Sequence, residues 1–117
     1  MDFGYSREFK RQLKRLSRRY RQIRKDIEPI IDVLVAGETP GDQITGVDYP
    51  LYKVRAKNTD AQRGKSGGYR VIYYLKTTTS LILMTVYSKS EYDDIPADAL
   101  VRLVEEIKQE IGSSEDD

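Results

Sequence analysis

The residues of this 117-residue sequence best suited to chemistry are cations and tyrosines around a glycine-rich turn. The stretch 63–75 begins as that turn and becomes a β-branched and aromatic run, which predicts a loop leading into a central strand. Lys65 and Arg70 bracket the turn with positive charge, while Gly64, Gly67 and Gly68 allow the backbone to come close to a ligand. The pattern indicates a binding site for an anion such as a phosphate.

The net charge of +1 conceals a strong segregation of charge along the chain. Residues 7–25 hold ten Lys/Arg against one acid, and residues 53–89 hold eight against one. Residues 26–52 hold six acids and no base, and residues 91–117 hold ten acids against two bases. The basic segments favour a polyanionic partner. Solvated basic helix faces are the alternative, and they fit residues 7–25 better than residues 53–89.

Several kinds of site are disfavoured by composition. The chain has no cysteine and no histidine, which excludes disulfides and a cysteine nucleophile and makes a zinc site improbable. A Gly-Lys-Ser run is present, but Thr59 stands where a nucleotide-binding phosphate loop needs glycine, and a strand follows instead of a helix. Because the acids avoid the predicted strands, we also set aside metal-dependent cleavage. We expect no metal and no cofactor.

RNA is one polyanion that cations and tyrosines suit, and its cleavage without a metal needs a base for the 2′-hydroxyl, an acid for the leaving oxygen and cations around the phosphate. With no histidine, the proton-transfer candidates are lysine, tyrosine and glutamate. Clustered cations are expected to lower the pKa of Lys65, Lys89 or Tyr87 towards useful values. Arg55 and Arg70 suit charge stabilisation, because a guanidinium keeps its proton and grips phosphate oxygens in a fork.

Hydrophobic spacing predicts the elements that position these residues. A short strand is expected around Phe3 and Tyr5, and Ser6 is a candidate helix cap. An apolar stripe at helical spacing then runs to Gly37, which is long enough to predict two helices forming a hairpin, with a kink or first turn near Pro29. A last helix is predicted from Pro96 to Gly112.

Three strands are predicted over residues 52–57, 69–76 and 81–89. Alternation places Ile82, Met84 and Val86 on the face that packs on the helical hairpin. The opposite face is expected to be open, either for RNA or as a passive docking surface. It would present Lys53, Arg55, Lys57, Arg70, Tyr74, Tyr87 and Lys89.

The predicted fold class is therefore α+β: a small antiparallel-dominated sheet packed on an N-terminal helical hairpin, with a C-terminal helix. We expect one domain over residues 1–112 and a disordered acidic tail over residues 113–117. The first residues resemble neither a signal nor a transit peptide, and no apolar run approaches the length of a membrane span. A cytoplasmic protein without membrane contact is expected.

Several short motifs in this order resemble the RelE/ParE superfamily of bacterial toxins, closest to its RelE and HigB-like branch. The resemblance covers nearly the whole chain, and its most specific part is Gly-Lys-Ser-Gly-Gly-x-Arg followed by Tyr-x-Lys-x-Glu. The matching residues are Gly37, Gly41-Asp-Gln-Ile44, Gly46, Lys53-x-Arg55, Gly64-Lys65-Ser66-Gly67-Gly68-Tyr69-Arg70-Val71-Ile72-Tyr73 and Tyr87-Ser88-Lys89-Ser90-Glu91.

The resemblance implies a RelE-like fold and the toxin of a type II toxin–antitoxin pair. RelE-like members cleave mRNA in the ribosomal A site, without metal, by attack of the 2′-hydroxyl. Carried over by position, the catalytic set is Arg55, Lys65, Arg70, Tyr87 and Lys89. Unlike members with a short end carrying a catalytic tyrosine, this chain has a full predicted helix after Glu91. Tyr87, Lys89 and Glu91 therefore remain open choices for the general base.

The resemblance also implies partners. These are an antitoxin encoded next to the toxin, the ribosome with its mRNA, and operator DNA only through the antitoxin complex. Two alternatives stay open: a ParE-like inhibitor of DNA gyrase that is not a nuclease, and an inactive RNA-binding member. The expected RNA contacts are Lys53, Lys57, Arg63, Tyr74 and Glu91, and the expected ribosome or antitoxin contacts are Lys14, Arg15, Arg18 and Arg19.

Overall fold

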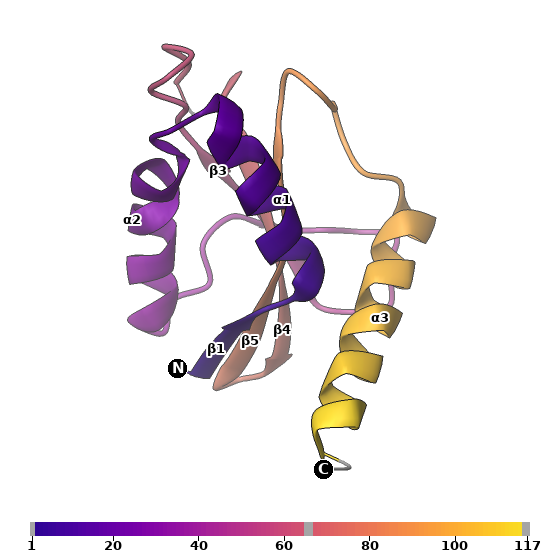
Figure 1. The fold of residues 1–117 in the computed structure, drawn as a ribbon. Coiled ribbons are helices and arrows are strands. Elements are labelled where there is room, and N and C mark those ends of the chain that lie inside the picture. Colours follow the sequence, from indigo (N-terminus) through magenta and orange to yellow (C-terminus); the bar gives the residue numbers. More distant parts are fainter. Residues whose placement is uncertain (1, 65–66, 116–117) are drawn as a thin grey trace.

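The computed structural model describes residues 2–64 and 67–115, in which three helices accompany five strands (Figure 1). No helix in this part of the chain is long and apolar enough to cross a membrane. The elements in chain order are β1 (Asp2–Tyr5), α1 (Arg7–Arg19), α2 (Ile23–Val35), β2 (Asp42–Gln43), β3 (Leu51–Ala56), β4 (Tyr69–Thr77), β5 (Ser80–Ser88) and α3 (Ala97–Glu115).

The five strands form one mixed sheet in the order β1-β5-β4-β3-β2. The pairs β2–β3, β3–β4 and β4–β5 are antiparallel, and β1 joins β5 in parallel. The predicted α+β class is thus confirmed, and the three main strands lie within one residue of their predicted bounds at each end. The two-residue strand β2 was not predicted, because a pair of polar residues between turns carries no alternation to detect.

One core cluster joins α1 and α2 to the sheet. Leu13 and Leu16 of α1 and Ile27 and Leu34 of α2 are buried with Val71 of β4 and with further residues of β3, β4 and β5. These helix positions recur at the spacing that brings side chains onto one face of a helix. Gly37, at φ +94°, follows α2 in a conformation that favours glycine and ends that helix as predicted.

The break between α1 and α2 lies at residues 20–22, so the alternative that a helix begins near Pro29 is wrong. Pro29 lies inside α2, where it cannot donate to the carbonyl of Lys25. Both residues are exposed, so solvent can reach that carbonyl. The break is fixed from outside the helices, because Asp60 Oδ2 accepts a hydrogen bond of 2.8 Å from the backbone N–H of Gln22, the residue before α2.

The second face of the sheet is covered as well, which corrects the prediction of an open face. Leu100, Val104 and Ile107 of α3 form a second core cluster with Ile72 of β4 and other strand residues. Figure 1 shows α3 on the opposite side of the sheet from α2. The helix continues through Gly112 to Glu115, three residues beyond its predicted end and into the predicted tail. Residues 116–117 of that tail lie outside the described residues.

A register irregularity in β5 corrects the predicted strand faces. Ile72 pairs with Thr85 and the next residue, Tyr73, pairs with Leu83, so one residue of β5 is skipped. Such a bulge exchanges the faces of the residues on either side of it. Val86 therefore packs with α1 and α2 as predicted, whereas Ile82 and Met84 pack in the α3 cluster.

Ser6 links the start of α1 to the sheet, and its replacement by alanine is expected to destabilise the fold. Its Oγ accepts a 3.0 Å bond from the N–H of Phe9 and donates a 2.8 Å bond to the carbonyl of Met84. Because the site is 1% exposed, water cannot replace these bonds. We expect Ser6→Ala to lower the free energy of unfolding by about 1–3 kcal/mol in urea titrations.

The matched control is Ser17→Ala, which removes only a bond to the carbonyl of Lys14 within α1. We expect this variant to unfold within about 0.5 kcal/mol of the wild type. Equal unfolding midpoints for the two variants would contradict the capping role of Ser6.

Candidate functional site

Three of the predicted catalytic side chains lie in one row across the sheet. Arg55 of β3 is directly opposite Arg70 of β4, and Arg70 is directly opposite Tyr87 of β5. Directly paired residues point to the same face, with Cβ atoms about 4.5–5.5 Å apart. The sequence motifs, 15 and 17 residues apart, are thus brought together by strand register. We refer to these residues as the Arg55–Arg70–Tyr87 row.

Of the two arginines in the row, Arg70 is the buried one. It is 5% exposed, and its Nη1 donates to the carbonyl of Tyr69 at 3.1 Å. Burial, and then the neighbouring Arg55 guanidinium, lower the pKa of Arg70, although an arginine stays protonated at neutral pH. Arg55 is exposed. An anion placed between the two guanidinium groups would relieve their mutual repulsion and offset the burial of charge.

The pKa of Tyr87 is shifted in the direction opposite to the one expected. Burial, and then the Asp94 carboxylate, raise the pKa of Tyr87 to about 12, with Arg70 opposing the change. The expectation that clustered cations lower its pKa is therefore wrong, because the ring is 2% exposed and burial outweighs the nearby charge. Tyr87 keeps its proton at neutral pH and suits a hydrogen-bond donor or acid. Within the described residues its Oη has no hydrogen-bond partner.

Backbone contacts at the end of the sheet hold the segment between β3 and β4. Asn58 and Arg63 exchange backbone hydrogen bonds of 2.8 Å, which closes the loop between them. The carbonyl of Gly68 accepts from the N–H of Lys89 at 2.9 Å. A Cβ atom at Gly68 would collide with the backbone carbonyl of Ala56, so only glycine fits there. Both sides of the loop are therefore fixed close to the row.

Lys65, the predicted lysine of the same loop, lies outside the described residues. Lys89 follows β5 and is half-buried. Its Nζ donates to the carbonyl of Asp93 at 2.9 Å and is 3.5 Å from the Asp93 carboxylate. The ammonium group is thus already engaged by the chain that follows it.

The remaining predicted contacts are spread more widely. Lys53 is half-buried and pairs with Asp94 at 3.2 Å, while Lys57 and Arg63 are exposed. Tyr74 is half-buried against Tyr49, about 13 Å along β4 from the row. It contributes to the α3 cluster, which disagrees with the prediction that it lies on an open RNA-binding face.

The predicted contacts on α1 are exposed and include one link to the site. Lys14, Arg15, Arg18 and Arg19 all face solvent to a large extent. Arg15 donates to both carboxylate oxygens of Glu91, at 3.0 and 3.3 Å, so α1 is tied to the segment that follows β5. Arg19 lies over the ring of Tyr20, 5.2 Å from its centroid. The helix therefore presents a basic surface connected to the end of the sheet.

Sequence reasoning missed the acids that bond to β3 and its following loop, near the row. Asp26 of α2 is buried, and its Oδ2 accepts from the N–H of Thr59 at 2.9 Å, which holds the loop after β3. Asp94 pairs with Lys53, and its carboxylate contributes to the raised pKa of Tyr87. The excess of acid after residue 90 was visible in the sequence, but the sequence does not show which cations these acids contact.

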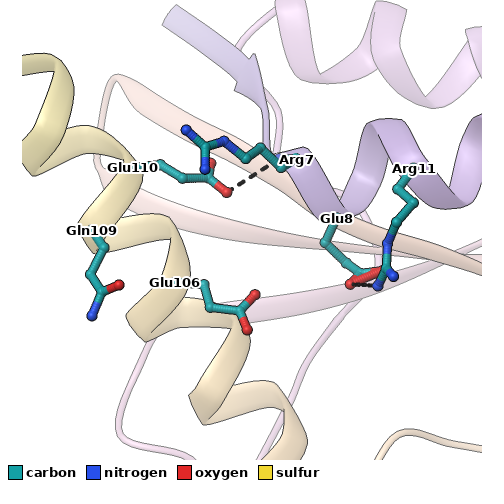
Figure 2. Close-up of a pocket in the computed structure, with 6 residues that line it drawn as sticks. All are labelled: Arg7, Glu8, Arg11, Glu106, Gln109 and Glu110. Carbon is teal, nitrogen blue, oxygen red and sulfur yellow. Dashed lines mark hydrogen bonds and ion pairs between the residues drawn. The ribbon is translucent and has the colours of Figure 1, made fainter.

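Two surface hollows differ in their relation to the row. One of about 310 Å³ adjoins it and is lined by both Arg55 and the Lys53–Asp94 pair. The other, of about 330 Å³, lies between α1 and α3 (Figure 2). In the second hollow acid and base already face each other, as in the Glu8–Arg11 ion pair, so it suits a free anion less well. Figure 2 labels its lining residues: Arg7, Glu8, Arg11, Glu106, Gln109 and Glu110.

Comparison with known proteins adds no family. No protein-family model and no curated protein matches this chain. Within the described residues, no three His, Cys, Asp or Glu side chains are grouped so that they could hold a metal ion. The chemistry of the site is therefore argued from the row and its surroundings.

Because the Tyr87 hydroxyl is buried, we expect the protein to lose stability at alkaline pH. In the unfolded chain tyrosine ionises near pH 10, whereas folded Tyr87 ionises near pH 12. Its contribution is fully present below pH 10 and is lost as the pH rises towards 12. Over that window Tyr87→Phe should lose less stability than the wild type, by on the order of 1–3 kcal/mol.

Urea unfolding of both proteins at pH 7 and at alkaline pH measures this difference. Tyr92→Phe, at a tyrosine that is 52% exposed, is the matched control. If Tyr87→Phe and the wild type show the same pH dependence, the buried hydroxyl does not hold its proton as described.

Proposed function

We propose that the chain has a RelE-like fold and is the toxin of a type II toxin–antitoxin pair, a metal-independent mRNA endoribonuclease that inhibits translation. The observation that carries this proposal is the Arg55–Arg70–Tyr87 row, in which strand pairing aligns two guanidinium groups and a neutral phenol. Two guanidinium groups can bind the oxygens of one phosphate, and the phenol can donate a further hydrogen bond.

The reaction supported by these groups is attack of an RNA 2′-hydroxyl on the adjacent phosphorus. A new P–O2′ bond forms and the P–O5′ bond breaks, which leaves a 2′,3′-cyclic phosphate and a 5′-hydroxyl. Arg55 and Arg70 stabilise the charge that develops on the phosphate oxygens. Because Tyr87 holds its proton, its role is to donate to a phosphate oxygen or to the leaving 5′-oxygen.

The proton of the 2′-hydroxyl needs a separate acceptor. Lys65 and Lys89 are the lysines that the sequence places beside the row, and we propose them for this transfer. Glu91 is a further choice; its carboxylate is engaged by Arg15, just as the Lys89 ammonium group is engaged by Asp93. Tyr87 is the weakest, because it would first have to lose a proton that burial retains.

The exposed basic face of α1 supports the proposed partners. Ribosomal RNA and an acidic segment of an antitoxin are both polyanionic, and either would be attracted by Lys14, Arg15, Arg18 and Arg19. Competition of the antitoxin with RNA for this surface would neutralise the toxin. In this proposal the protein acts in the cytoplasm, and it meets operator DNA only through the antitoxin complex.

Substitution of the arginines of the row tests the proposed nuclease activity. We expect Arg55→Ala and Arg70→Ala to lower mRNA cleavage by about 100-fold or more and to remove growth arrest, because each loses a group that stabilises the developing charge. Cleavage is measured by mapping mRNA 5′ ends after induction in a bacterial host, together with pulse-labelled protein synthesis. Arg55 is exposed, so its variant removes charge without opening a cavity.

The matched control is Lys76→Ala, which removes an exposed cation at the other end of β4 and should leave cleavage unchanged. Full toxicity of Arg55→Ala and Arg70→Ala would refute the site. Intact mRNA with stalled replication on induction of the wild type would instead favour a ParE-like gyrase inhibitor.

A further inference from the structure

The segment between β5 and α3, residues 90–96, crosses the end of the sheet and joins two sets of cations. We call this segment the strap. On one side Glu91 accepts from Arg15 of α1 at 3.0 and 3.3 Å. On the other side Asp94 accepts from Lys53 of β3 at 3.2 Å. Each end of the strap thus places a carboxylate on a cation expected to bind RNA or the ribosome.

The strap also packs against Tyr87 of the row. The ring of Tyr92 lies edge-on to the ring of Tyr87, with centroids 6.0 Å apart and an interplanar angle of 78°. Tyr92 and Ile95 line the same hollow as Tyr87, between the strap, α1 and the start of α3. The phenol beneath is 2% exposed, and its Oη is without a partner among the described residues. A substrate can reach this hydroxyl only if a covering element moves, and the strap is the one held mainly by exposed contacts.

We propose that the strap is an autoinhibitory element, whose carboxylates occupy Lys53 and Arg15 in the free protein and are displaced by the phosphates of bound RNA. This inference rests on the proposed function, because it concerns access to the same site. A carboxylate and a phosphate are alternative anionic partners for one ammonium or guanidinium group. Displacement therefore exchanges one ion pair for another and at the same time uncovers Tyr87.

The strap is held weakly enough to open. The Asp94 side chain is 67% exposed and its partner Lys53 is 29% exposed, so solvent screens their attraction. The Arg15–Glu91 pair is likewise partly exposed, at 45% and 25%. The backbone of the strap is anchored at its start, where the carbonyl of Ser88 accepts from Glu91 at 2.9 Å and from Tyr92 at 3.2 Å, and at the first turn of α3, where the carbonyl of Pro96 accepts from Leu100. The Lys89 side chain adds a bond to the carbonyl of Asp93. Opening between these anchors leaves β5 and α3 folded.

The charges of the hollow in Figure 2 do not form a second strap of this kind. There Glu110 accepts from the backbone N–H of Arg7, so it joins α1 to α3 and is not part of the segment that follows β5. Removal of an acid there changes the net charge but not access to the row. The strap is distinguished by which cations its acids occupy.

Binding of a non-cleavable RNA tests the strap. The probe is a fluorescent 12-nucleotide RNA with 2′-O-methyl groups throughout, and affinity is read by anisotropy at two salt concentrations. We expect Asp94→Asn and Glu91→Gln each to bind about 3- to 10-fold more tightly than the wild type at low salt. The gain should shrink as salt rises. Asp94→Glu, which keeps the carboxylate, should bind like the wild type.

Asp98→Asn is the matched control. It makes the same change of charge four residues away and breaks an exposed ion pair of 3.1 Å with Arg102 of α3, outside the strap. General relief of repulsion would tighten Asp94→Asn and Asp98→Asn equally, and this result would overturn the strap. Absence of RNA binding by every variant would overturn it too, since no phosphate would then compete for its cations.

The assay separates the strap from the nuclease. It measures binding of an RNA that cannot be cut, so tighter binding by the strap variants supports the strap even if the wild type cleaves no mRNA. Conversely, a protein that cleaves mRNA but whose Asp94→Asn and Asp98→Asn variants bind alike keeps the nuclease and loses the strap.

Discussion

Burial of β4 on both faces is the constraint on which the rest of the structure depends. Residues Tyr69–Tyr73 are all buried, since α1 and α2 cover one face of the sheet and α3 covers the other. Arg70 lies inside this stretch and still carries its charge. A guanidinium group tolerates such a position better than an ammonium group, because it is less strongly hydrated and can bond to several acceptors. One acceptor is the carbonyl of Tyr69, next to it in the chain.

The placement of the bulge preserves the row. The skipped residue of β5, Met84, lies between the pairs Ile72–Thr85 and Tyr73–Leu83, so the bulge begins beyond Ile72 along the strands from Arg70. From Tyr69 to Ile72 the two strands stay in phase, so Arg70 and Tyr87 share a face. A bulge between Arg70 and Ile72 would turn one of these side chains to the face covered by α1 and α2. The bulge can adapt the far half of the sheet to α3 without disturbing the row.

Local patterns predicted the elements other than β2, and the residues of the row, because alternation and helical spacing depend on near neighbours in the chain. They could not predict which surface α3 covers. Leu100, Val104 and Ile107 show that the helix has an apolar face, but a sequence does not name the partner of that face. The predicted open face followed from leaving α3 aside. The predicted faces of Ile82 and Met84 failed because alternation has no means to register a skipped residue.

The same limit explains why the chemistry of Tyr87 was misjudged. Its neighbours in the pattern are cations, which lower the pKa of a phenol, but its neighbours in space include α3 and the strap, which remove water. Only the packed structure shows that burial raises the pKa of Tyr87 by more than the charge of Arg70 lowers it.

Segregated charge takes on a physical meaning once the chain is folded. The acidic segment after residue 90 lies beside the basic segments, so Lys53 and Arg15 are neutralised at short range while the net charge stays at +1. Neutralisation of this kind weakens the long-range attraction of the site for any polyanion. It would not weaken the contact of a phosphate bound directly to Arg55 and Arg70, because that contact would be partly desolvated. For the proposed RNA substrate, a site built in this way would favour RNA held near it by other contacts over RNA that binds from free solution.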